Sequence, residues 1–386
     1  MDRLTTSEAF AARFGHTCEA LARAPGRVNL IGEHTDYNDG YVLPIALEFC
    51  TWVGCARRRD GVTRAVSLDL SDERSWPLDD WNAEEHPHWT SYVAGVADLL
   101  RRRGAPLDGF DLLIRSEVPV GGGLSSSAAL EVATALALTS IAGVSHAHTE
   151  LADLCREAEH AFAGVPCGIM DQYVSVLGRA DTAFLLDCRS RTYEHIPFLL
   201  NGHVVVIVDS GVRHELAAGE YARRQAECHR AVEYFRSHDA QVHALRDVSI
   251  ETVREHASRM EAPAAARSRH VTSEIQRTLT AAQALRDGNL AELGRLMSAS
   301  HRSLRDDYQV SCPELDRLVE ILSGLDGVLG ARLTGGGFGG CVVAIARQSS
   351  VAPIEDALRD RYDPTVKTPA RLMLTRPGPG ASLELP

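Results

Sequence analysis

The chain has 386 residues, which is enough for two domains that each bury a hydrophobic core. Hydrophobic residues make up 45% and charged residues 24% of the sequence, a globular composition that excludes a disordered, collagen-like or coiled-coil chain. The net charge of -12 argues against binding to nucleic acid or to a membrane surface, so the expected partner is a small molecule.

The basic residues are almost all arginines, because Lys367 is the single lysine among 40 basic side chains. No glycine precedes Lys367, which excludes a Walker A phosphate loop. A protein kinase needs a lysine on an early strand, and the sequence has none there. Any binding of nucleotide phosphates must therefore proceed without a lysine.

The nine cysteines, spread from Cys18 to Cys341, include no Cys-x-x-Cys pair and are odd in number. This pattern indicates reduced thiols and neither a disulfide framework nor a zinc ribbon. No stretch reaches the roughly 18 apolar residues of a membrane span. We therefore expect a cytoplasmic protein that does not associate with a membrane.

The apolar pattern predicts mixed α and β structure along the whole chain. In the first half we expect a strand over Phe110–Val118, a helix over Ala128–Ile141 that is capped by Ser125 or Ser126 and stops at Gly143, and an amphipathic helix over Thr149–Ala163 that ends at Gly164. A buried strand over His203–Val208 follows, with a turn at Asp209–Gly211 and then a helix over Gly219–Arg236. The rest of the chain should form two or three helices between Ser249 and Ser323, a strand over Cys341–Ala346 and an irregular tail from Arg376 to Gly380. A dip in the apolar pattern around Arg189–Glu194 places the domain boundary between residues 195 and 196. The expected domains are 1–195 and 196–386.

The loop Pro119–Ala128 is rich in glycine and serine and lies between the first predicted strand and helix. Glycines allow backbone N–H groups to approach a phosphate, and the helix start adds unpaired donors. The helix dipole is worth only about 0.3–1 kcal/mol, so Mg²⁺ held by a serine hydroxyl and a carboxylate would be needed for a triphosphate. The alternative is an ordinary glycine turn with a serine cap.

A second glycine cluster, Gly335–Gly340, formally matches the dinucleotide pattern Gly-x-Gly-x-x-Gly. It leads into a strand, whereas the dinucleotide motif follows a strand and opens a helix. We therefore interpret it as a loop that supports or lines a site, with a tight structural loop as the alternative.

Polar side chains gather in the segment Gly26–Gly40. Arg27 offers a permanent charge for a phosphoryl transition state, and Glu33, His34 and Asp36 are groups that bind sugar hydroxyls. The alternative is a hydrogen-bonded turn with surface charges.

The segment Glu159–Gln172 holds a carboxylate, Asp171, directly after a stiff turn. Asp171 could accept the proton of an attacking hydroxyl, with an arginine close by to keep it ionised. The alternatives are a helix N-cap for Asp171 and a solvated helix position for Glu159.

Taken together and in this order, these segments resemble the GHMP small-molecule kinases, and among them most closely the galactokinases. The similar segments are Gly26–Tyr37 for the sugar signature, Pro119–Ala128 for the phosphate loop, Leu333–Gly340 for the third motif, and Gly168–Gln172 and Ser311–Asp316 in addition. The resemblance covers nearly the whole chain, and its first motif is the specific one.

The resemblance implies an N-terminal mixed-sheet α/β domain, a C-terminal ferredoxin-like domain and a site in the cleft between them. It also implies a monomeric enzyme that uses ATP and Mg²⁺ to phosphorylate galactose at its anomeric 1-hydroxyl. The implied roles are transition-state stabilisation for Arg27, a catalytic carboxylate for Asp171, sugar contacts for Glu33, His34, Asp36, Gly168 and Tyr221, nucleotide contacts for Gly121, Gly122, Gly123, Leu124, Ser125, Ser126 and Ser127, and Mg²⁺ ligation for Ser127 and Glu159.

Three alternatives share these motifs: an N-acetylgalactosamine kinase, an arabinose kinase and a non-catalytic sensor of galactose and ATP. Sensors of this type are disrupted around the phosphate-loop serines. Here the run Ser125–Ala129 is intact and both Arg27 and Asp171 are present, which favours catalysis.

Overall fold

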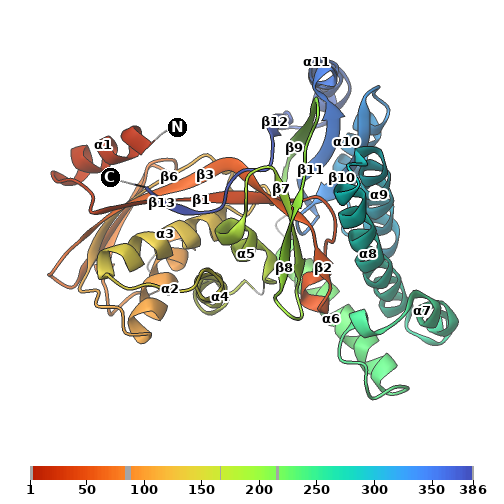
Figure 1. Ribbon diagram of the computed structural model, residues 1–386, viewed down its shortest axis with the longest axis horizontal. Helices are drawn as coiled ribbons and strands as arrows, with labels where there is room; N and C mark the ends of the chain where they lie inside the picture. The colour runs from red at the N-terminus through yellow and green to blue at the C-terminus, as the bar shows by residue number, and fades with distance from the viewer. Residues whose placement is uncertain (1–2, 83–87, 166, 214–216, 385–386) are drawn as a thin grey trace.

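The computed structural model describes residues 3–82, 88–165, 167–213 and 217–384. Figure 1 shows a large sheet with helices on both faces and, beside it, a second sheet covered by long helices. The large sheet holds, in spatial order, β13 (Ser382–Glu384), β1 (Ala20–Asn29), β3 (Pro44–Arg57), β6 (Phe110–Ser116), β4 (Val62–Ser67) and β5 (Asp72–Pro77). Neighbours pair antiparallel except β4 and β6, which are parallel.

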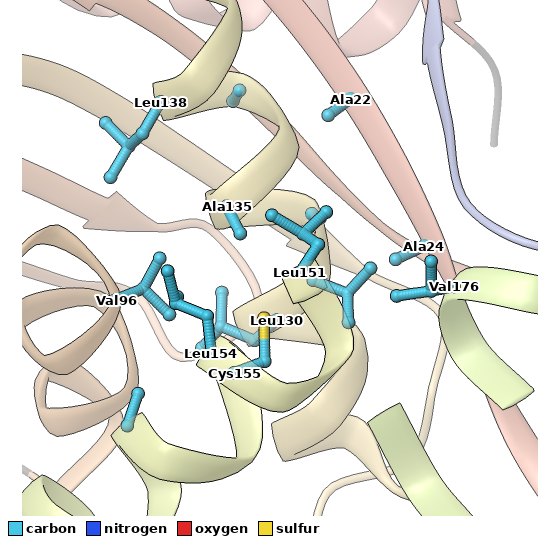
Figure 2. Close-up of a cluster of buried hydrophobic side chains, with 14 of the residues drawn as sticks. Ala22, Ala24, Val96, Leu130, Ala135, Leu138, Leu151, Leu154, Cys155 and Val176 are labelled. Atoms are coloured by element: carbon cyan, nitrogen blue, oxygen red, sulfur yellow. The ribbon is translucent and has the colours of Figure 1, made fainter. Parts of the chain in front are cut away.

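Helix α1 (Arg3–Phe14) packs on one face of this sheet through Phe10, which is fully buried. The helices on the opposite face are α2 (His88–Arg102), α3 (Ser126–Ala142), α4 (His148–Ala158), its π-helical continuation η2 (Glu159–Ala163) and α5 (Met170–Leu177). Helix α3 contacts β1, β3, α2 and α4, and its apolar residues surround it on every side. Figure 2 shows Leu130 of α3 beside Leu154 and Cys155 of α4 within this core.

The second sheet is fully antiparallel, in the order β10 (Val328–Thr334), β11 (Gly339–Arg347), β9 (His203–Arg213) and β12 (Arg371–Thr375). Its helices are α6 (Ala217–Arg236), α7 (Ile250–His256), α8 (Ala262–Arg286), α9 (Leu290–Ser303), α10 (Pro313–Ser323) and α11 (Val351–Ala357). The short turns of helix are η1 (Asp36–Asn38), η3 (Leu245–Asp247), η4 (Ala257–Arg259), η5 (Leu304–Tyr308), η6 (Gln348–Ser350), η7 (Leu358–Tyr362) and η8 (Asp363–Thr365). This architecture confirms the predicted two-part α/β fold.

A three-stranded sheet of β2 (Tyr41–Val42), β7 (Thr182–Asp187) and β8 (Tyr193–Pro197) lies between the two larger sheets. One buried cluster joins the two halves, since Val28 of β1 and Ile207 of β9 belong to it together with Met297 of α9. At the end of the chain, β13 returns to pair with β1. Among the described residues, no helix combines the length and apolarity that a bilayer crossing requires.

Several local predictions are confirmed and two are wrong. Strand β9 continues through Asp209–Gly211, where a turn was predicted, because β11 pairs with it again at Arg213. The residues between form a bulge that includes Gly211, φ 70°, and the β12 ladder ends at Asp209. The region 249–323 contains four α-helices and not two or three, since a short separate helix, α7, precedes α8.

Candidate active site

A cavity of about 720 Å³ lies where the two halves of the chain meet. Arg27 and Asp171 line it, as do the expected sugar contacts Glu33, His34, Asp36, Gly168 and Tyr221. Gly121, Gly123, Ser125, Ser126, Ser127 and Glu159 line it as well. Gly335 and Gly336 also line it, so the second glycine cluster lines a site as predicted.

Arg27 and Asp171 form a two-point ion pair at the centre of the cavity. Arg27 Nε lies 2.8 Å from Asp171 Oδ1, and Arg27 Nη2 lies 2.7 Å from Oδ2. Arg27 Nη1 donates to the carbonyl of Gly123 at 2.5 Å, and Ser125 Oγ donates to Asp171 Oδ2 at 2.5 Å. Burial lowers the pKa of the Arg27 guanidinium, but the charges of Asp171 and Glu33 outweigh it and raise the pKa overall. The arginine is therefore a fixed cation.

The backbone explains how this pair is positioned. At Gly26, beside Arg27 in β1, a Cβ would lie 2.6 Å from the carbonyl of Leu124, so only glycine lets the strand pass against the phosphate loop. Asp171 is the second residue of α5, and Ile169 occupies the N-cap position. The alternative of an N-cap role for Asp171 is therefore wrong, and its carboxylate faces the cavity.

The phosphate loop has an unusual backbone. Gly121 and Gly123 have φ values of 70° and 75°, and Ser125 has a φ of 58° just before α3 begins. Ser125 occupies the N-cap position, but its side chain makes no capping bond because its hydroxyl donates to Asp171. The side chain of Leu124 is fully buried in the cluster shared by the two halves, so only its backbone is available to a ligand.

The residues expected to bind sugar form one wall of the cavity. Glu33 is 3% exposed, and its carboxylate accepts hydrogen bonds from the backbone N–H of Gly335 at 2.7 Å, the hydroxyl of Thr334 at 3.1 Å and the side-chain amide of Asn29 at 3.0 Å. A Cβ at Gly168 would collide with the carboxylate of Asp36. A glycine at 168 is therefore what allows Asp36 to lie against this turn.

Asp36 is a titratable group of this wall whose pKa is raised by its surroundings. Burial, followed by the charges of Asp171 and Glu33, raises the pKa of Asp36 to about 7. Backbone hydrogen bonds from Tyr37 and from Asp36 itself act in the opposite direction. The Asp36 carboxyl thus keeps its proton up to about pH 7.

We expect this shift to appear as a pH dependence of stability. The unfolded chain ionises Asp36 near its ordinary pKa, whereas the folded chain holds the proton to about pH 7, so the free energy of unfolding falls as pH rises between these values. Asp36→Asn removes this contribution. Relative to the parent, the variant should gain about 1–4 kcal/mol of stability between pH 4 and pH 8, measured by chemical denaturation. Parallel pH profiles for the two proteins would contradict the shift.

A corner of the cavity offers oxygen ligands of the kind that Mg²⁺ prefers. Glu159 of η2 is 4% exposed and lines the cavity, so a solvated position for this residue is wrong. Burial is the largest effect on Glu159 and raises its pKa overall, although hydrogen bonds from Cys167, Ser127 and Gln172 act to lower it. Gln172 Nε2 lies 2.6 Å from Glu159 Oε2, and Cys167 Sγ lies 3.1 Å from the same oxygen. Ser127 and Glu159 thus form a donor set that fits the ion.

The comparison with known proteins agrees with this geometry. Three family models match the chain. The galactokinase galactose-binding signature matches residues 8–57, the GHMP kinases N terminal domain residues 91–179, and the GHMP kinases C terminal domain residues 281–364. A galactokinase of Chloroflexus aurantiacus is 46% identical over 358 residues, which cover 93% of this chain and 92% of the relative. The human galactokinase is 43% identical over 364 residues, covering 92% and 91%.

The chain belongs to the galactokinase family of GHMP kinases. The crystal structure of Lactococcus lactis galactokinase complexed with galactose superposes with a TM-score of 0.92 at 34% identity, covering 98% of this chain and 99% of that one. A mevalonate kinase of Methanococcus jannaschii, at 19% identity and a TM-score of 0.66, shares the fold. The galactose-binding signature spans Arg27, Glu33, His34 and Asp36.

Two parts of the cavity and its immediate surroundings could not be predicted from the sequence. Arg213, at the end of β9, lies against the phosphate loop: a Cβ added to Gly121 would be 3.4 Å from its Nε, and one added to Gly122 would be 3.5 Å from its Nη2. Arg213 also pairs with Asp209 through two hydrogen bonds of 2.9 and 2.7 Å. Its side chain is 40% exposed. No sequence signal marks it, because 39 of the 40 basic residues are arginines.

The other part is the apolar end of the cavity. It is lined by Leu70, Trp89, Tyr92, Ile114 and Leu130, with Ser67, Asp69 and Ser116 among the polar groups beside them. Trp89 and Tyr92 lie three residues apart on α2, a spacing that is equally typical of an ordinary core stripe. Only the fold shows that this stripe opens into the cavity.

Proposed function

We propose that this chain transfers the γ-phosphoryl group of ATP to the anomeric 1-hydroxyl of galactose, giving galactose 1-phosphate and ADP. The observation that carries the proposal is the two-point pair of Arg27 and Asp171 in a cavity lined by the galactose-binding signature. The relatives named galactokinase, at 43–46% identity over nearly the full chain, support the same substrate.

In the proposed reaction, Asp171 accepts the proton of the sugar 1-hydroxyl, and the oxygen of that hydroxyl forms a bond to the γ-phosphorus of ATP. The bond from that phosphorus to the bridging oxygen breaks, and ADP leaves. Arg27 holds the carboxylate in place and lies where negative charge develops during transfer. Catalysis of this kind depends on positioning and charge neutralisation more than on covalent chemistry.

The remaining expected residues would bind the two substrates. Glu33, His34, Asp36, Gly168 and Tyr221 would contact galactose, and Gly121, Gly122, Gly123, Leu124, Ser125, Ser126 and Ser127 would surround the ATP phosphates. The apolar end of the cavity, with Trp89 and Tyr92, suits the adenine ring. Ser127 and Glu159 would hold Mg²⁺, which when bound neutralises phosphate charge.

Glu159→Gln is expected to raise the Mg²⁺ concentration needed for half-maximal activity by about tenfold, because a neutral amide is a poorer ligand for a hard cation. The affinity for galactose, measured by calorimetry without nucleotide, should remain unchanged. An unaltered Mg²⁺ titration would show that the ion is held by other groups.

Arg213→Met is expected to raise the KM for ATP by about tenfold, with a smaller effect on the KM for galactose. The reason is its place against the phosphate loop, where a guanidinium can pair with phosphate oxygens. Arg295→Met is a matched control, since Arg295 is exposed and pairs with Glu292 on α9, and it does not line the cavity. Equal KM values for ATP in both variants would contradict a phosphate contact.

The alternatives are an N-acetylgalactosamine kinase, an arabinose kinase and a non-catalytic sensor, and the relatives do not favour them. The deciding experiment is a coupled ADP-release assay with ATP, Mg²⁺ and a panel of sugars compared by kcat/KM. We expect galactose to be the best substrate. A preference for another sugar would overturn the specificity, and galactose binding without ADP release would indicate a sensor.

We further propose a division into domains 1–195 and 196–386 and a monomeric, cytoplasmic enzyme. Light scattering during size-exclusion chromatography should give a mass near that of one chain. A mass of twice that value would overturn the monomer.

A further inference from the structure

His34 lies at one end of a chain of buried polar groups. His34 Nδ1 is 2.8 Å from the hydroxyl of Tyr37, which is 2.7 Å from the hydroxyl of Tyr308, which in turn is 3.1 Å from the sulfur of Cys228. His34, Tyr308 and Cys228 are 4%, 0% and 3% exposed. At the other end, His34 Nε2 is buried and forms no well-aligned hydrogen bond with a described residue, although the backbone of Gly336 lies close to the ring.

We propose that Tyr37, Tyr308 and Cys228 are positioning residues that hold His34 in the tautomer with hydrogen on Nε2, so that the ring donates a hydrogen bond to a sugar oxygen. This inference rests on the proposed function, because it assumes that the sugar binds beside His34. It adds the direction of the hydrogen bond and three residues that the sequence did not single out.

The ring of His34 is neutral. Burial lowers the pKa of His34 well below its ordinary value, and the charges of His270, Arg332 and Arg224 act in the same direction. The backbone of Gly336, close to the ring, acts in the opposite direction without reversing the result. A neutral imidazole carries one N–H, so the partner of one nitrogen decides what the other can do.

The hydrogens of the chain can point in two directions. In the first, the thiol donates to Tyr308, Tyr308 donates to Tyr37, and Tyr37 donates to the bare Nδ1. In the second, Nδ1–H donates to Tyr37, and the last phenol donates to sulfur. Sulfur is a weak acceptor, whereas the imidazole nitrogen is a good one, so the first direction uses both phenol donors better. This direction leaves the hydrogen of His34 on Nε2.

The rings around His34 fix its orientation as well. Its ring centroid lies 4.6 Å from that of Tyr308 and 5.6 Å from that of Tyr221. The ring therefore stays in the wall of the cavity that also holds Glu33 and Asp36. An N–H donor beside two carboxyl groups suits a sugar hydroxyl, because the hydroxyl can accept a hydrogen bond from the ring and donate one to a carboxyl group.

The test is a nitrogen NMR spectrum of the whole protein with ¹⁵N-labelled histidine, with and without galactose. The signal of His34 is identified by its loss in His34→Gln. We expect a protonated Nε2 and a bare Nδ1 in the parent. Tyr37→Phe should lose this fixed tautomer and weaken galactose binding about 5- to 20-fold, with kcat changed less than about twofold.

Two comparisons separate positioning from folding. Tyr234→Phe removes a hydroxyl that lies 3.1 Å from Nδ1 of another histidine, His256, outside the cavity, and it should leave the His34 signal and galactose affinity unchanged. Cys228→Ser keeps a donor to Tyr308 and should retain the parent tautomer, whereas Cys228→Ala should weaken galactose binding by a few fold.

The possible failures are distinguishable. A bare Nε2 in a parent protein that still binds galactose would overturn the inference alone, and so would unchanged affinity in a folded Tyr37→Phe. If Tyr37→Phe does not fold, the inference is decided by the tautomer of His34 in the parent and by the comparison of Cys228→Ser with Cys228→Ala. A parent protein that binds no galactose in calorimetry would overturn the proposed function itself.

Discussion

Asp171→Asn is expected to lower kcat by about 10²–10⁴-fold, because the amide occupies nearly the same space but cannot take the proton of the sugar hydroxyl. The affinity for galactose should change little, since the expected sugar contacts lie on other residues. The measurement is steady-state ADP release at saturating ATP and galactose, together with galactose calorimetry in the absence of nucleotide.

Ser125→Ala provides the matched control for this experiment. It removes the 2.5 Å hydrogen bond to Asp171 Oδ2 but leaves the carboxylate and its pair with Arg27. We expect a loss in kcat of about tenfold or less, since one hydrogen bond is lost without the proton acceptor. Near-normal kcat in Asp171→Asn would show that Asp171 only orients Arg27 and that the transition state needs little help from a base.

Much of the site could be predicted because its motifs are continuous in the sequence. The segments around Arg27, Gly121 and Asp171 each carry a local pattern, and the resemblance joined them into one site. Arg213 could not be found this way, since its proximity to the phosphate loop depends on the place where β9 ends. The hydrogen bond between Glu159 and Gln172 could not be predicted either, because the two residues lie on different helices.

The errors in the fold have a common physical cause. Asp209, Ser210 and Gly211 form a good turn signal locally, and Gly211 does adopt a positive φ. Strand β11 nevertheless pairs with β9 on both sides of this segment, at Asp209 and at Arg213, so the local turn preference becomes a bulge within a longer strand, while the β12 ladder ends at Asp209. Tertiary pairing of this kind cannot be read from the local sequence. The return of β13 to the first sheet, near the end of the chain, escaped prediction for the same reason.

Arg27→Lys is expected to lower kcat by about 10²–10³-fold although it conserves the charge. The guanidinium of Arg27 makes two parallel contacts with Asp171 and a third with the carbonyl of Gly123. A lysine ammonium is a compact point charge on a flexible stem and cannot hold all three at once. The carboxylate of Asp171 would lose its fixed orientation toward the sugar hydroxyl, and the charge beside the transferred phosphoryl group would no longer be fixed.

Arg246→Lys separates this effect from a general loss of an arginine–aspartate pair. Arg246 contacts both oxygens of Asp187 at 2.5 and 2.9 Å, with side-chain exposures of 18% and 16%, and neither residue lines the cavity. We expect Arg246→Lys to lower the free energy of unfolding while leaving kcat unchanged. If Arg27→Lys lowers kcat no more than Arg246→Lys does, then charge alone suffices at position 27. A larger loss in Arg27→Lys than in Asp171→Asn would assign the main catalytic role to charge stabilisation by Arg27, as a loose transition state requires.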